Sequence, residues 1–271
     1  MNKLRKLTKA IGRICRHPYL LNLVLQDEGA AKEETLRRYA CPDGLPLVEL
    51  STLFPDFQEK VFPYAYLSGA TMPIDIALLK ALAAKYGAKD YFEIGTWRGE
   101  SVANVAEVVP HCVTFNLPKE RIVALTHNPD YAGLHGFFSQ SKAGVEQVYG
   151  DSQTFDFTPH EGKFDLIFVD GDHHRESVLK DTRTAFRLRR DERSIIVWHD
   201  YAYDPESIRW NVLSAILEGT PPEMRGRLYH VAHTLCAVYL PESLGTFETH
   251  KLSPYEAPRQ CFEVALRAHD C

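Results

Sequence analysis

The sequence predicts an α/β protein with a doubly wound, mostly parallel sheet of seven strands and an antiparallel hairpin at its C-terminal edge. Between residues 90 and 198, short apolar runs alternate with segments of helical periodicity. Such alternation is typical of parallel strands joined by helices that cover both faces of a sheet. After residue 198, two β-rich runs lie close enough together to pair as a hairpin. At 271 residues and 45% hydrophobic, the chain can bury one sizeable core.

An N-terminal extension, helical and irregular, is expected over residues 1–69, before the main domain over 70–245 and a C-terminal tail over 246–271. Residues 1–17 contain basic and apolar residues at helical spacing and no acid. The basic residues are Lys3, Arg5, Lys6, Lys9, Arg13 and Arg16, and the apolar ones are Leu4, Leu7, Ile11 and Ile14. This pattern predicts an amphipathic helix that either packs on the body or lies on a membrane surface. Residues 27–66 contain four prolines and are expected to be irregular, without a long helix.

The elements of the main domain follow in a regular order. A helix begins at Pro73 and is ended by Gly87, a favourable residue after a helix C-terminus. Parallel strands are expected at 90–94, 112–116, 145–149, 166–169 and 195–198, with helices at 101–108, 130–141 and 175–189 between them. A further helix is expected at 207–217, and the hairpin strands at 228–232 and 235–240.

Composition narrows the classes of partner. A formal net charge of -5 gives no general attraction for a polyanion, so we expect no nucleic-acid partner, and small molecules or glycans fit better. Six cysteines without a CxxC pair, together with no cleavable signal at the start, indicate reduced thiols and a cytoplasmic protein. No apolar stretch near the start is long enough to cross a bilayer. The sequence leaves a homo-oligomer open.

The turn after the first predicted strand has the composition of a cofactor loop. Glu93 is followed by Gly95 and Gly99, and the loop leads directly into a helix whose first N–H groups are free. A dinucleotide-binding GxGxxG is missing, and Glu93 would repel a pyrophosphate. An acid at this point suits a cationic ligand that bears an amino acid. The candidate cofactor residues of this loop are Glu93, Gly95, Thr96, Trp97, Gly99 and Ser101.

This ExGxxxG loop resembles motif I of the class I methyltransferases, in which Trp97 stands where the family usually has its middle glycine. The resemblance implies a Rossmann-like fold and S-adenosyl-L-methionine as cofactor, bound by the domain over 70–245. It places Asn116, after the second strand, at the ribose, and Asp151 and Ser152, after the third, at the adenine. The alternatives are a plain strand-to-helix turn at the loop, an ordinary turn at Asn116, and an Asp151 side chain that caps its own backbone.

Two acidic segments follow the next two strands. Asp170 and Asp200 are expected at the same sheet edge, where two carboxylates repel unless a cation lies between them. Asp170 to His173 reads DGDH and resembles the macrocin-type, metal-dependent sugar O-methyltransferases, with His199 in place of the first acid of the second pair. The predicted metal ligands are therefore Asp170, His199 and Asp200, which leaves Mg²⁺ and Mn²⁺ open. Asp170 is also expected to contact the cofactor.

A histidine beside these acids suits proton transfer. His173 is the candidate base for an acceptor hydroxyl and Asp170 its catalytic partner, with His174 as the alternative base. The expected activity is O-methylation of a sugar, a glycan precursor or another polar hydroxylated small molecule, assisted by a divalent metal. A metal-independent N- or phenolic O-methyltransferase and a non-catalytic S-adenosylmethionine-binding protein remain as alternatives.

Overall fold

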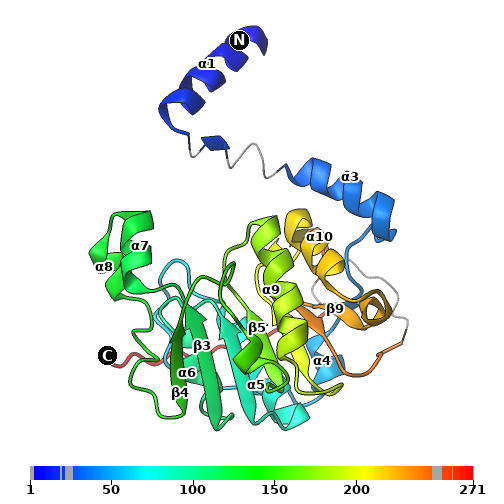
Figure 1. Cartoon of the computed structure of the whole chain (residues 1–271). Helices are drawn as coiled ribbons and strands as arrows, with labels where there is room; N and C mark the ends of the chain where they lie inside the picture. The colour runs from blue at the N-terminus through cyan, green and yellow to red at the C-terminus, as the bar shows by residue number, and fades with distance from the viewer. Residues whose placement is uncertain (1–2, 19, 22–26, 246–251, 258, 271) are drawn as a thin grey trace.

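The computed structural model describes residues 3–18, 20–21, 27–245, 252–257 and 259–270. Its main sheet has eight strands in the order β1-β9-β10-β6-β5-β2-β3-β4 (Figure 1). The parallel strands are β2 (Asp90–Ile94), β3 (His111–Asn116), β4 (Val145–Tyr149), β5 (Leu166–Val169) and β6 (Ile195–Trp198). Strand order therefore reverses between β2 and β5, which is where ligands bind in open α/β sheets.

Alternate side chains of the parallel strands are buried on opposite faces of the sheet. Phe92 and Ile94 belong to one apolar cluster, whereas Tyr91 and Phe168 belong to the other. Helices α9 (Arg175–Leu188) and α10 (Trp210–Gly219) cover the first face, and α5 (Pro73–Tyr86) and α6 (Glu100–Val105) the second. Burial on both faces confirms the predicted doubly wound sheet.

The C-terminal hairpin forms as predicted, but it is not the edge of the sheet. Strand β10 (Ala237–Tyr239) pairs antiparallel with both β6 and β9 (Leu228–Val231). A two-residue strand, β1 (Leu47–Val48), then pairs in parallel with β9 and adds an eighth strand. So short a strand shows no alternation in the sequence, yet it covers backbone groups that the hairpin would otherwise expose.

The expectation that residues 27–66 hold no long helix is wrong for their first part. Helix α3 (Glu28–Tyr39) ends before the first proline of this segment, and the Asp27 carboxylate caps it by accepting from the N–H of Gly29. Glu28 accepts from Asn211 Nδ2 at 2.9 Å, which joins α3 to α10. Tertiary contacts of this kind leave little periodicity in the sequence. The only other helix within the described residues 27–66 is the four-residue α4 (Leu50–Leu53).

Two other segments differ from the predicted elements. The expected helix over 130–141 is replaced by α7 (Lys119–Thr126) and the short α8 (Pro129–Gly133), because His127 is left-handed and Asn128 caps a new helix. The helix expected over 207–217 begins only at Trp210. Before it, β7 (Ala202–Asp204) and β8 (Ser207–Ile208) form a separate two-stranded sheet. Two 3₁₀ turns, Thr158–His160 and Pro222–Arg227, complete the described elements of the domain.

The amphipathic helix at the start is present as α1 (Lys3–Arg16), but none of its residues is buried. Figure 1 shows it standing apart from the sheet and its flanking helices. The structure therefore does not show this helix packed on the body, which was one of the two interpretations of this segment. Across the described residues, no helix combines the length and the apolar character needed to cross a membrane.

Candidate active site

A cavity of about 940 Å³ lies where the parallel strands end, on both sides of the reversal between β2 and β5. Its volume is in the range of small-molecule and cofactor sites. Most of the predicted site residues line it, each from the end of a strand or from the turn that follows. They are Gly95, Thr96, Trp97, Asn116, Asp151, Ser152, Asp170, His173, His199 and Asp200.

Glu93, Gly99 and Ser101 do not line this cavity. Glu93 is fully buried and accepts a hydrogen bond from the Tyr91 hydroxyl at 2.7 Å. Burial raises the pKa of the Glu93 carboxyl to about 8, against the opposing effect of hydrogen bonds from Tyr91 and Ser101. Glu93 and Ser101 thus form a buried hydrogen-bonded pair beneath the loop. They are not placed to contact a ligand in the cavity.

The two glycines of the loop are required by contacts within the protein. Gly95 has φ +103°, and a Cβ there would lie 2.0 Å from the carbonyl oxygen of Asp170. At Gly99, with φ +78°, a Cβ would lie 2.4 Å from Ser139 Oγ. Gly95 therefore permits the turns after β2 and β5 to touch, which brings Asp170 beside the loop.

One wall of the cavity combines an amide with aromatic rings. Asn116 Nδ2 donates to the Thr96 carbonyl oxygen at 2.8 Å and lies 2.8 Å from His135 Nδ1. The Trp97 ring packs against Tyr131 and His135, with ring centroids 4.5 and 4.7 Å apart. His135 Nδ1 also lies 2.9 Å from the Thr96 carbonyl oxygen, so the amide nitrogen of Asn116 faces the protein and its oxygen is left for a ligand.

Asp151 forms the self-capping turn that was one of its two interpretations. Its Oδ1 accepts from the N–H of Gln153 at 2.9 Å, and Ser152 Oγ accepts from Gln153 Nε2 at 3.1 Å. Both residues still line the cavity, and the second oxygen of Asp151 is not used in this turn. A structural role and a ligand contact are compatible here.

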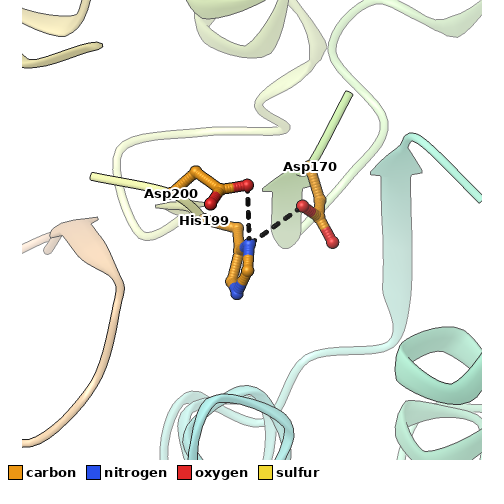
Figure 2. A group of neighbouring side chains, drawn as sticks. All are labelled: Asp170, His199 and Asp200. Carbon is orange, nitrogen blue, oxygen red and sulfur yellow. Dashed lines mark hydrogen bonds and ion pairs between the residues drawn. The ribbon is translucent and has the colours of Figure 1, made fainter. Parts of the chain in front are cut away.

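Asp170, His199 and Asp200 converge as predicted from the ends of adjacent strands (Figure 2). His199 Nδ1 lies 3.1 Å from Asp170 Oδ1 and 3.1 Å from Asp200 Oδ2. One ligand atom from each residue lies within 4.8 Å of the others. Ligand atoms about 2.1 Å from a metal stand roughly 3 Å apart, so these three residues fit a divalent cation.

Two residues that were not predicted from the sequence support this cluster. Asp75, fully buried on α5, lies with its Oδ2 3.1 Å from His199 Nε2 and accepts from the N–H of Leu235 through Oδ1. Thr71 Oγ1 donates to Asp170 Oδ2 at 3.1 Å. Asp75 directs Nδ1 of His199 toward the two aspartates, as carboxylates do for metal-bound histidines. In its helix, Asp75 resembles an ordinary first-turn acid, and only the tertiary fold brings it to His199.

Charged neighbours within the cluster shift the pKa values of His199 and Asp200. Burial alone would lower the pKa of His199, but Asp170, Asp200 and Asp75 raise it well above the usual value. Burial would likewise raise the pKa of Asp200, but hydrogen bonds from His173 and His199 hold it far below the usual range. Arg209 adds an ion pair to Asp200 Oδ1 at 3.1 Å. Without a bound cation, protonated His199 balances part of the negative charge.

His173 lies at the edge of this cluster. Its Nδ1 is 2.9 Å from Asp200 Oδ2, and this hydrogen bond raises the pKa of the imidazole despite partial desolvation. His174 is turned to Asp172 and does not line the cavity. Asp172 also accepts from Ser177 Oγ at 2.7 Å, as suits a residue at a helix start. Of the two histidines, only His173 lines the cavity.

The family described as "Methyltransferase domain" matches residues 92–201, less than half of the chain. This range runs from β2 to just beyond β6 and contains the whole acid and histidine cluster except Asp75. Residues 92–201 are therefore similar to a methyltransferase domain, and the mostly parallel sheet has the Rossmann-like arrangement that the sequence predicted. No curated protein matches the chain.

Several solved structures are similar to the chain at low sequence identity. A cofactor-bound protein from MTB, Rv0187, has 23% identity and a TM-score of 0.44, covering 64% of this chain and 82% of its own. The O-methyltransferase TomG from Streptomyces achromogenes, in complex with SAM, has 20% identity and a TM-score of 0.42, covering 63% and 81%. CalS11, a TDP-rhamnose 3'-O-methyltransferase, has 14% identity and a TM-score of 0.42, covering 62% and 79%.

Proposed function

We propose that the protein transfers a methyl group from S-adenosyl-L-methionine to a hydroxyl oxygen of a sugar, a glycan precursor or another polar small molecule. The observation that carries this proposal is the convergence of Asp170, His199 and Asp200 with His173 on one cavity of a methyltransferase domain. A binding protein has little need of a base held by a carboxylate beside its ligand.

The cavity suits a cationic cofactor that carries a nucleoside. Asp151 and Asp170 supply negative charge along its wall, which favours a sulfonium and an ammonium group. The Asn116 oxygen is left to accept from a ribose hydroxyl, without the added strength that a carboxylate would give. Thr96, Trp97 and Ser152 complete the proposed cofactor contacts.

Proton removal from the acceptor is assigned to His173. Its Nδ1–H donates to Asp200, so the neutral imidazole presents Nε2 as the basic nitrogen. The acceptor oxygen forms a bond to the methyl carbon while the bond from carbon to sulfur breaks. The hydroxyl proton moves to His173 Nε2, and the sulfonium becomes a neutral thioether.

Asp170, His199 and Asp200 would hold a divalent cation, with Asp75 fixing the orientation of His199. Such a cation, when bound, lowers the pKa of an acceptor hydroxyl and orients it. His199 must first lose the proton from Nδ1, because a ligating imidazole is neutral.

A second candidate is methyl transfer to nitrogen or a phenolic oxygen without a metal. The hydrogen bonds of His199 favour it, since three carboxylates stabilise the imidazolium and this internal cation balances their charge. Chelation distinguishes the two. Activity lost with a chelator and restored by Mg²⁺ or Mn²⁺ supports the metal-assisted reaction, whereas activity that chelator leaves unchanged supports the second candidate.

The first test is calorimetric titration with S-adenosylhomocysteine, with and without Mg²⁺, on the wild type and on Asp170→Asn/Asp200→Asn. We expect cofactor binding by the wild type, and Mg²⁺ binding that the double variant loses. Absence of any cofactor binding would contradict the proposal as a whole. Cofactor binding without Mg²⁺ or Mn²⁺ binding would contradict only the metal-assisted form.

A further inference from the structure

Helix α1 exposes a continuous apolar face. Leu4, Leu7 and Ile11 are 69%, 55% and 53% exposed, although soluble proteins rarely leave such side chains together in water. The helix is well formed over 14 residues, and no residue of it is buried against the domain. This exposed apolar face indicates that α1 is a binding surface, which a partner covers.

Charge on this helix is separated from the apolar face. At about 100° per residue, Leu4, Leu7, Ile11 and Ile14 share one side of the helix. The opposite side is basic and holds Arg5, Lys6, Lys9, Arg13 and Arg16. Among the described residues, none of these five side chains forms an ion pair that would hold it against the domain. Their charge is therefore available to a partner.

The charge of the helix also contrasts with that of the chain. Residues 3–16 contain six basic residues and no acid, whereas the whole chain has a formal charge of -5. A partner that offers negative charge and an apolar layer side by side matches both faces of α1. An anionic bilayer does so at the boundary between its headgroups and acyl chains.

We propose that α1 docks the protein on the surface of a bilayer that contains anionic lipid. The helix lies in the plane of the interface, with Leu4, Leu7 and Ile11 in the acyl boundary and the basic side chains among the headgroups. With 14 residues it cannot cross the bilayer. This inference does not depend on the proposed reaction, since no residue of α1 lines the cavity.

The test is flotation of the full chain with vesicles of neutral phosphatidylcholine, alone or with anionic phosphatidylglycerol. We expect binding to the anionic vesicles that weakens as salt is raised, and little binding to the neutral ones. Lys6→Gln/Lys9→Gln should weaken binding roughly 30-fold, since each basic residue near an anionic surface contributes roughly a fivefold gain. Leu7→Gln/Ile11→Gln should abolish it.

Matched controls carry the same changes elsewhere on the surface. Lys163→Gln/Arg193→Gln removes two exposed charges from the domain, and Val264→Gln/Leu266→Gln removes two exposed apolar side chains from the tail. Both are expected to bind vesicles as the wild type does.

Three outcomes would overturn the proposal. The first is no binding to anionic vesicles, and the second is binding that the α1 variants leave unchanged. The third is self-association of the free protein that Leu7→Gln/Ile11→Gln abolishes and that added vesicles do not reduce. This result would mean that the apolar face of α1 binds a second copy of the chain. None of these outcomes bears on cofactor binding.

Discussion

At the scale of single residues, His173 depends on one neighbour for its role. The hydrogen bond to Asp200 fixes its orientation, and Nε2 is left to take a proton. We expect His173→Gln to lower turnover by about 10²- to 10⁴-fold, the usual contribution of a general base, with affinity for S-adenosylhomocysteine unchanged. Single-turnover rates and calorimetry separate the two effects.

His174→Gln is the matched control, because this side chain is turned to Asp172. Its turnover should stay near that of the wild type. The pH profile is a second check, since Asp200 raises the pKa of His173 and the base must be neutral to act. The rate should rise with pH along a limb above about 6.5, the ordinary histidine value. Full turnover by His173→Gln would defeat the assignment.

Asp75 does not line the cavity itself but contacts His199, so we regard it as a positioning residue. Asp75→Asn keeps the shape but removes the charge that holds Nε2. Loss of such a support typically weakens metal binding about 10- to 100-fold, and we expect this loss for Mn²⁺ with S-adenosylhomocysteine affinity unchanged. Asp172→Asn, which removes an exposed carboxylate from a neighbouring turn, should bind the metal normally. Equal Mn²⁺ affinity in Asp75→Asn and the wild type would exclude this role.

The sequence predicted those site residues that directly follow a strand. Asp170 and Asp200 could be paired from the alternation alone, because parallel strands end at the same edge. Asp75 and Thr71 could not be predicted, since neither directly follows a strand, and only the tertiary fold brings them to His199 and Asp170. Glu93 was predicted as a cofactor contact but is buried and does not line the cavity, because a motif gives the position of a residue and not the direction of its side chain.

At the scale of elements, the turn between β2 and α6 depends on Gly95. Any Cβ there would overlap the Asp170 carbonyl oxygen, and φ +103° is unfavourable for other residues. We expect Gly95→Ala to lower the free energy of unfolding by about 3 kcal/mol, as a clash and a strained backbone add up. Urea denaturation measures the loss.

Two glycines elsewhere calibrate this value. Gly87→Ala meets no atom but has φ +66° after α5, so it should cost about 1 kcal/mol. Gly226→Ala meets no atom and has no positive φ, so it should change stability by less than about 0.5 kcal/mol. A Gly95→Ala variant no less stable than Gly87→Ala would contradict the close contact between the two turns.

The elements that were predicted well are those whose burial leaves a signal in the chain. Strands β2, β4, β5 and β6 have the expected bounds, and in β5 and β6 an unbroken, fully buried apolar run is flanked by turn residues. The segment after β3 was predicted wrongly because its helices are short and one ends at the left-handed His127, a conformation that histidine does not signal in a sequence. Strand β1 exists only through its pairing with β9.

At the scale of the whole molecule, buried acids make stability depend on pH. Burial raises the pKa of Glu93 to about 8 and that of Asp181, inside α9, to about 7. The folded protein therefore retains protons that the unfolded chain has lost above its ordinary carboxyl pKa of about 4. At these two carboxyls the unfolded state binds fewer protons between about pH 5 and 8, so their contribution to the free energy of unfolding falls as pH rises.

Glu93→Gln tests this dependence, because glutamine keeps the shape and the acceptor oxygen for Tyr91 without titrating. The wild type should lose stability relative to this variant, on the order of a few kcal/mol, as pH rises from about 5 to 8. Urea midpoints at several pH values measure the difference. Glu223→Gln, at an exposed position, should follow the wild type at every pH. Parallel curves for the wild type and Glu93→Gln would contradict this prediction and would mean that Glu93 is ionised in the folded protein. The hydroxyls of Tyr91 and Thr114 that donate to Glu93 are neutral, so a buried Glu93 carboxylate would need a cation beside it.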